Sequence, residues 1–188
     1  MSKDILILYS GGADSRLMLE LALKMKKNVY CLLVNYGQKH RKELEVAKNQ
    51  LEKLGVVGTI VTVKDLSVDS ALTGDNQRGR YEDVSEWYVP SRNLLFVSLA
   101  CSIAESWEID TIWYGANFSD RLDLFPDCTQ EWVVKVNELL QINGSKPMKL
   151  EAPLLGMSKE VVFEILEKVF KINESELFSG YAEKPDRK

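Results

Sequence analysis

The sequence has one histidine and three cysteines, and this scarcity argues against several classes of protein. The cysteines are widely spaced and form no C-x-x-C pair, so neither a disulfide scaffold nor a zinc finger is expected (Cys31, Cys101 and Cys128). His40 alone cannot build a multi-histidine metal site. There is no run of about 18 apolar residues and Asp4 interrupts the first apolar stretch, so we expect neither a spanning helix nor a secretory signal. We therefore expect a cytoplasmic protein without a membrane partner.

Basic side chains are too few for a surface built to hold duplex nucleic acid. The chain carries 24 basic and 28 acidic side chains, a formal net charge of −4 at pH 7. Nucleic acid is therefore not expected to bind directly. With 188 residues, 45% of them hydrophobic, the chain can form one domain with a substantial core. Because it shows no internal repeat and no low-complexity tract, we treat residues 1–188 as a single domain.

Apolar runs rich in β-branched residues alternate with amphipathic stretches along the chain. Strands are predicted at residues 4–9, 29–35, 59–63 and 109–114. Helices are predicted directly after residues 10–15 and at about 40–54, 93–107, 127–141 and 158–170. This alternation is typical of an α/β protein with a Rossmann-like parallel sheet and helices on both faces. Residues 64–89, which contain Arg78 and Arg80, lack any period and are expected to form a mobile loop, and residues 178–188 a loose tail.

Polar clusters fall at positions that this fold brings to one edge of the sheet. In a right-handed strand-helix-strand unit, each helix begins at the carboxyl edge of the parallel sheet, where ligands bind. One cluster follows the first predicted strand, and the others open helices: residues 10–15, His40, Arg92 with Asn93, Asp127, and Lys159. We therefore predict that these clusters meet on one rim.

The strongest single motif is Ser10-Gly11-Gly12-Ala13-Asp14-Ser15, between the first strand and its helix. Adjacent glycines allow positive φ angles and a concave nest of backbone N–H groups, and the helix adds partial positive charge. A polyphosphate suits such a nest. The hydroxyls of Ser10 and Ser15 can donate to phosphate oxygens, and Asp14 can bind Mg²⁺ or cap the helix. The alternative is a plain glycine turn with a serine and aspartate cap.

This loop resembles the pyrophosphate loop of the N-type ATP pyrophosphatases, which adenylate an acyl or carbonyl oxygen and release pyrophosphate. Three further segments, in order, resemble those of the 7-cyano-7-deazaguanine synthases: Asn35-Tyr36-Gly37-Gln38-Lys39-His40, Val89-Pro90-Ser91-Arg92-Asn93 and Phe125-Pro126-Asp127-Cys128. The resemblance covers about residues 4–181 and implies an adenine nucleotide alpha hydrolase-like fold, with ATP and Mg²⁺. It implies that 7-carboxy-7-deazaguanine and ammonia become the nitrile through adenylated acid and amide intermediates, a step in queuosine biosynthesis.

The resemblance and the predicted rim together give three sets of candidate residues. The catalytic candidates are Ser10, Asp14, Ser15, Arg92 and Lys159. The ATP-binding candidates are Tyr9, Ser10, Gly11, Gly12, Ala13, Asp14, Ser15, Asn35, His40 and Gly115. The substrate-binding candidates are Arg92, Asn93, Phe118, Asp120, Phe125 and Asp127.

Each role rests on side-chain chemistry. Arg92 can clamp a phosphate or a carboxylate, and a cation such as Lys159 at a helix start is better explained by an anion nearby. The two oxygens of Asp127 match the N1–H and amino donors of a guanine-like edge, although helix capping alone would account for this residue. Phe118 and Phe125 can stack on a deazapurine or simply fill the core. Cys128 is expected to be a small buried hydrophobe.

Two departures from the family leave alternatives open. Members of that family end in a four-cysteine zinc cluster, which this sequence lacks, so zinc is not predicted. Ser91 and Asn35 replace a usual glycine and aspartate. The enzyme could therefore stop at 7-amido-7-deazaguanine, adenylate another acid or a macromolecule, or be an inactive nucleotide-binding relative. Ammonia would come from solution or a partner, and the oligomeric state stays open, with a homodimer as one outcome.

Overall fold

A computed structural model describes residues 3–37, 41–63, 89–122 and 125–177, without the side chains of 41, 42, 121 and 122. The strands are β1 (Asp4–Leu8), β2 (Asn28–Asn35), β3 (Val57–Thr62), β4 (Thr111–Trp113) and β5 (Lys149–Glu151). The helices are α1 (Ala13–Lys24), α2 (Arg41–Leu54), α3 (Arg92–Ser106), α4 (Phe118–Leu122), α5 (Gln130–Leu140) and α6 (Lys159–Lys168), followed by the 3₁₀ turn η1 (Glu174–Glu176). None of the helices in these ranges is long and apolar enough to cross a membrane.

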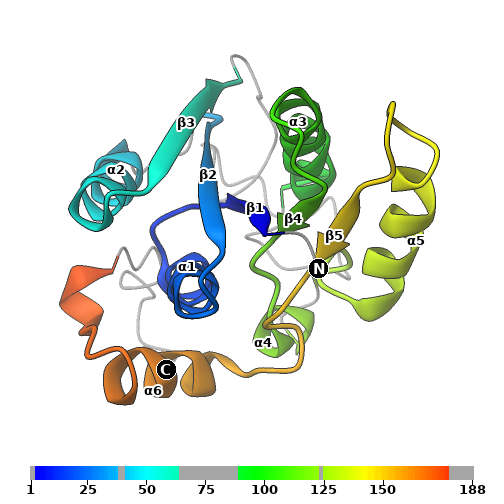
Figure 1. The fold of residues 1–188 in the computed structure, drawn as a ribbon. Helices are drawn as coiled ribbons and strands as arrows, with labels where there is room; N and C mark the ends of the chain where they lie inside the picture. Colours follow the sequence, from blue (N-terminus) through cyan, green and yellow to red (C-terminus); the bar gives the residue numbers. More distant parts are fainter. Residues whose placement is uncertain (1–2, 38–40, 64–88, 123–124, 178–188) are drawn as a thin grey trace.

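The five strands form one sheet in the order β3-β2-β1-β4-β5, and every neighbouring pair is parallel. Helices α1, α2 and α6 cover one face of this sheet, and α3 and α5 cover the other (Figure 1). The predicted α/β fold with a parallel sheet is thus confirmed. The strand order reverses between β1 and β4, and in such sheets the crevice at the reversal is where ligands bind.

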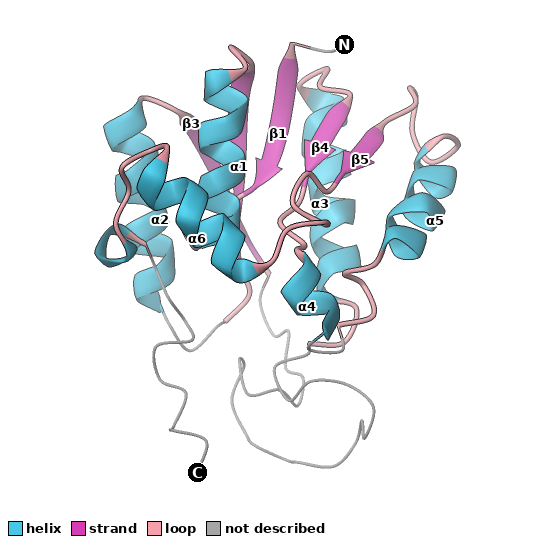
Figure 2. Cartoon of the chain, turned by 90° about the horizontal axis from the view of Figure 1, so that it is seen from below, coloured by secondary structure: helices cyan, strands magenta, loops and turns pink. Residues whose placement is uncertain are grey.

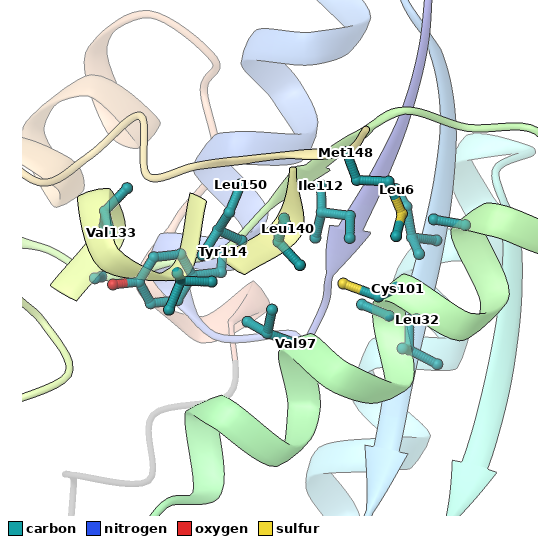
Figure 3. Packing of buried hydrophobic residues seen from close by; sticks show 14 of the residues in the cluster. Leu6, Leu32, Val97, Cys101, Ile112, Tyr114, Val133, Leu140, Met148 and Leu150 are labelled. Carbon is teal, nitrogen blue, oxygen red and sulfur yellow. The ribbon is translucent and has the colours of Figure 1, made fainter. Parts of the chain in front are cut away.

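Successive side chains along each strand point to opposite faces of the sheet, so the core has one part on each face. Leu6 and Ile112 point toward α3 and α5, where they pack with Val97 and Leu140 (Figure 3). Ile7 points to the other face, against α1. Each large apolar side chain buried in this way stabilises the fold by about 1.5–3 kcal/mol. Because β1 packs against both parts of the core, the position of the loop that follows it is fixed.

Several predicted boundaries are wrong, and short elements were missed. β5 and α4 are too brief to show a period in the sequence, and the predicted strands 59–63 and 109–114 are shifted to β3 and β4. Asp127 does not open α5. Thr129 is the N-cap, and its Oγ1 accepts a hydrogen bond from the Trp132 N–H over 3.2 Å. His40, residues 64–88 and residues 178–188 lie outside the described residues, whereas Val89 is buried.

Ser91, the N-cap of α3, adopts a left-handed conformation with φ 56°. A non-glycine residue pays a steric cost there because its Cβ crowds the backbone. A glycine, which the family motif has at this position, would adopt this conformation without that steric cost.

Among the described glycines, Gly11 combines a left-handed backbone with close packing against another helix. Its φ is +83°, and a Cβ added there would lie 3.0 Å from the Cβ of Ala47 on α2. We predict that Gly11→Ala lowers the free energy of unfolding by about 2–4 kcal/mol, because strain and overpacking add. Gly55→Ala is the matched control, since its φ is +64° but nothing lies within 4 Å of the added Cβ. Urea unfolding should show a loss of only about 1–2 kcal/mol for that control. Equal losses for the two variants would contradict the packing argument.

Candidate functional site

The loop between β1 and α1 is held in shape from inside by Ser15. Its Oγ accepts hydrogen bonds from the N–H groups of Ser10 (3.2 Å) and Gly11 (3.1 Å) and donates to the Gly12 carbonyl (3.0 Å). Because a hydroxyl has one proton, Ser15 has none left for a phosphate in this arrangement. Ser15 therefore shapes the loop, and donation of its hydroxyl to a phosphate stays a prediction.

Ser10 lies on the open side of the same loop. It is exposed, and its Oγ accepts a hydrogen bond from the Gly12 N–H over 3.3 Å. Gly12 is the N-cap of α1, with no side chain capping the helix, so the alternative role of Asp14 as the cap is wrong. The first turn of a helix leaves N–H groups without intrahelical partners and carries partial positive charge. The loop thus joins an exposed hydroxyl to an electropositive helix start, as an anion site requires.

Asp14 joins three segments that are far apart in the sequence. Its Oδ1 accepts a hydrogen bond from Asn117 Nδ2 over 3.0 Å, and its Oδ2 pairs with Lys159 Nζ. The side chains of Asp14 and Lys159 are 17% and 28% exposed, so the ion pair borders the surface. Gly115 allows this approach, since a Cβ there would lie 3.3 Å from the Asp14 Cβ. The predicted meeting of the loop with Lys159 is therefore observed, and Gly115, an ATP-binding candidate, also lies against Asp14.

Asn117 is a site residue that the sequence reasoning missed. It is fully buried, and its Oδ1 accepts from the Asp120 N–H (3.1 Å) while Asp120 Oδ2 accepts from the Asn117 N–H (3.2 Å). This reciprocal cap of α4 fixes the amide so that Nδ2 points at Asp14. Asp120 thus positions Asn117, and its binding of substrate stays a prediction. The spacing Asn-x-x-Asp a few residues after a strand was the available signal.

Lys159 is brought to the loop by the contact of two helix starts. Its backbone N–H donates to Ser119 Oγ over 3.0 Å, and the Phe118 N–H donates to the Met157 carbonyl over 2.8 Å. Helices α4 and α6 consequently begin side by side near the carboxyl edge of the sheet (Figure 2). The position of Lys159 as the first residue of α6 was predicted correctly.

A second polar cluster lies where β2 ends and α3 begins. Arg92 Nη1 is 3.4 Å from Tyr36 Oη, and its guanidinium lies 5.8 Å from the ring centroids of both Tyr36 and Phe96. Its Nε is buried and has no hydrogen-bond partner among the described residues. Burial raises the pKa of Glu43 to about 7, and the positive charge of Arg92 opposes that shift. Glu43 is a further residue that sequence reasoning missed.

Asp127 belongs to this second cluster. It is 7% exposed, and burial raises its pKa against the opposing effects of Arg92 and a hydrogen bond with Asn93. Tyr114 Oη donates to the Asp127 carbonyl over 2.8 Å, which anchors the segment before α5. Cys128 is buried, and burial strongly raises the pKa of its thiol, as suits the small hydrophobe predicted there. The cluster therefore places two carboxylates around one guanidinium.

The remaining candidate residues differ in how they relate to these clusters. Tyr9 lies under the loop, with its hydroxyl donating to Gln50 Oε1, and Asn35 Oδ1 accepts from the Gly37 N–H over 3.4 Å. Phe125 is buried in the core, whereas Phe118 is exposed, and the stacking of either ring on a ligand stays a prediction. Neither His40 nor the pair Arg78 and Arg80 falls in the described ranges.

Comparison with solved structures supports the fold. The chain resembles the U34-tRNA thiolase NcsA from Methanococcus maripaludis with a TM-score of 0.61 and 16% identity, over 95% of this chain and 60% of that chain. It also resembles a predicted subunit of tRNA methyltransferase from Methanocaldococcus jannaschii, with a TM-score of 0.55 and 18% identity, over 86% of this chain and 72% of that chain. At these identities the likeness concerns the fold alone.

Comparison with known sequences identifies the family. A family profile described as "Queuosine biosynthesis protein QueC" matches residues 4–188. A 7-cyano-7-deazaguanine synthase from Marinomonas sp. is 39% identical over 85% of this chain and 75% of that protein. A 7-cyano-7-deazaguanine synthase from Alteromonas mediterranea is 36% identical over 86% of this chain and 77% of that protein. The chain therefore belongs to the QueC family of queuosine biosynthesis proteins.

Proposed function

We propose that this chain is an ATP-dependent ligase that converts 7-carboxy-7-deazaguanine and ammonia to 7-cyano-7-deazaguanine. The observation that carries the proposal is the meeting of Asp14, Asn117 and Lys159 beside the glycine loop, at the sheet's strand-order reversal. The names of the relatives supply the product, 7-cyano-7-deazaguanine, whereas the acid, ammonia and ATP are carried over from the family resemblance. ATP would lie with its triphosphate on the loop, and the deazaguanine beside Arg92 and Asp127.

The proposed reaction solves the problem that a carboxylate is a poor electrophile. A carboxylate oxygen attacks the α-phosphorus of ATP, and pyrophosphate leaves. Ammonia then attacks the acyl carbon, AMP departs with that oxygen, and loss of a proton leaves the amide. A second ATP adenylates the amide oxygen with release of pyrophosphate. Over these steps the amide nitrogen loses both of its protons, and departure of AMP gives the nitrile. Each carboxylate oxygen thus leaves within one AMP.

The chain's own residues would bind the charges that develop in these steps. The N–H groups at the start of α1 and the Ser10 hydroxyl face the triphosphate, and Ser15 keeps the loop in that shape. The ammonium of Lys159 borders the loop, where it can stabilise negative charge on the departing pyrophosphate. Asp14 and Asn117 hold the ammonium in place. Arg92, with its buried Nε, would lie beside the ring of the deazaguanine.

The described residues fit Mg²⁺ poorly as a metal held by the protein. The two oxygens of Asp14 already accept hydrogen bonds from Asn117 and Lys159. The described part of the chain contains no group of three or more histidine, cysteine or acidic side chains that could hold a metal ion. Mg²⁺ bound through Asp14 stays a prediction from the sequence.

Purified protein incubated with ATP, Mg²⁺, ammonium and 7-carboxy-7-deazaguanine, followed by mass spectrometry of the products, tests the proposal. We expect the nitrile together with two AMP and two pyrophosphate for each acid consumed. An amide as the final product would limit the enzyme to the first half of the reaction. Formation of AMP without nitrile or amide, or no reaction, would contradict the proposal.

Lys159→Met is predicted to lower kcat by about 10²–10³, because a donor aimed at developing charge is removed. The fold should change little, since a partly exposed ion pair contributes about 0–1 kcal/mol. Lys168→Met is the matched control on α6, where an exposed lysine pairs with Glu164 over 2.6 Å. Steady-state kinetics should show wild-type turnover in that control. Wild-type turnover in Lys159→Met as well would remove the lysine from the mechanism.

Asp127→Asn tests recognition of the base. We expect kcat/KM for the acid to fall about 10- to 100-fold, because the amide turns a donor toward the donors of the guanine-like edge. The KM for ATP should stay at its wild-type value, since the loop is untouched. Asp110→Asn, an exposed residue just before β4, serves as the control. An equal rise in the KM for both substrates would point to general damage and count against this role.

A further inference from the structure

Gln50 on α2 connects the glycine loop to two other parts of the chain. Its Nε2 donates to the Gly11 carbonyl over 3.2 Å and to the Glu176 carbonyl over 2.8 Å, and its Oε1 accepts from the Tyr9 hydroxyl. The side chain is 6% exposed. Carbonyl groups can only accept, so the amide of Gln50 has one allowed orientation. Both of its N–H groups donate hydrogen bonds, and the three hydrogen bonds of the side chain join it to Tyr9, to the glycine loop and to η1.

The bond to Gly11 decides which way one peptide group of the loop faces. In a trans peptide the carbonyl and the following N–H point in opposite directions. The Gly11 carbonyl points toward α2, so the Gly12 N–H points to the open side of the loop. The exposed hydroxyl of Ser10 accepts its hydrogen bond there. The Gly12 N–H therefore faces the region where the triphosphate is proposed to bind.

Glycine on both sides makes this peptide easy to turn over. Gly11 has φ +83°, Gly12 has φ −79°, and neither carries a Cβ that would resist rotation of the peptide between them. Rotation by half a turn would aim the Gly11 carbonyl, a negative dipole end, at the phosphates. Ser15 does not prevent this, because it holds the Gly11 N–H and the Gly12 carbonyl, on the two neighbouring peptides.

We propose that Gln50 is a positioning residue that fixes the Gly11–Gly12 peptide with its N–H facing the polyphosphate. This inference rests on the proposed function, since it assumes that the loop binds phosphate. Gln50 does not touch the ligand. It acts through the backbone from the far side of the loop, and η1 shares the same side-chain amide.

The test is equilibrium binding of inorganic pyrophosphate and of AMP, measured by calorimetry. Gln50→Met keeps the length of the side chain and removes its hydrogen bonds. We expect it to weaken pyrophosphate binding about tenfold and to leave AMP binding unchanged, because only the peptide under the terminal phosphates is released. Gln141→Met is the matched control, since Gln141 Nε2 donates to the Met148 carbonyl over 3.2 Å, far from the loop. That control should bind both ligands as the wild type does.

Gln50→Glu adds a readout that a merely structural role would not give. An ionised carboxylate cannot donate to the Gly11 carbonyl, whereas the protonated acid can. The ratio of variant to wild-type pyrophosphate affinity should therefore recover as the pH is lowered, and the ratio cancels the titration of pyrophosphate itself. A ratio that does not change with pH would count against the proposal.

The outcomes separate this inference from the proposed function. Wild-type protein that binds no pyrophosphate would overturn the loop's phosphate role itself. Wild-type binding with an unchanged affinity in Gln50→Met, or an equal loss of AMP and pyrophosphate binding, would overturn only the role of Gln50. NMR of the wild-type protein does not depend on whether a variant folds. Pyrophosphate should shift the Gly12 amide resonance, and an unshifted resonance would also overturn the role of Gln50.

Discussion

The parallel pairing of β1 with β4 is the constraint on which the site depends. Neighbouring parallel strands end at the same edge of the sheet, so the segments that follow β1 and β4 lie side by side at that edge. This meeting puts Asp14 beside Asn117, although 103 positions separate them in the sequence. Gly115 then matters because a side chain on it would crowd the Asp14 Cβ. A phosphate site assembled in this way needs no single long motif.

Buried and exposed residues have different tasks in the site. Ser15, Gln50 and Asn117 are buried, and their polar atoms are used on the backbone and on neighbouring side chains. Ser10 and Lys159 reach the surface, where a ligand can meet them. Buried polar groups that are fully hydrogen-bonded rigidify their surroundings, whereas an exposed group costs little when it changes partner. The scaffold thus fixes the geometry and leaves the chemistry to the groups at the rim.

The sequence contained enough information for the layout of the fold and for the strand-loop-helix motif, because both depend on local periodicity and on glycine chemistry. The positions of Arg92 and Lys159 at helix starts were predictable for the same reason. The positions of Gln50 and Glu43 in the site were not predictable. On an amphipathic helix, the sequence does not distinguish a polar residue that is buried from one that is exposed until its neighbours are known. Asp127 was given the wrong local role because Pro126-Asp127 suggested a cap, while Thr129 is the residue whose hydroxyl reaches the helix. β5 has only three residues, too few for a period.

The charges of the two clusters determine how the proposed substrate must lie between them. Arg92 is flanked by Glu43 and Asp127, so this end of the site carries more acceptors than positive charge and suits the N–H donors of a guanine-like edge. The other end combines Lys159 with the electropositive start of α1 and suits anions. A deazaguanine bears its donor edge on the six-membered ring and the 7-carboxylate on the five-membered ring. Placing the donor edge at Asp127 therefore turns the carboxylate toward the loop, where the α-phosphate of ATP would be attacked, and the reverse orientation would bring three carboxylates together.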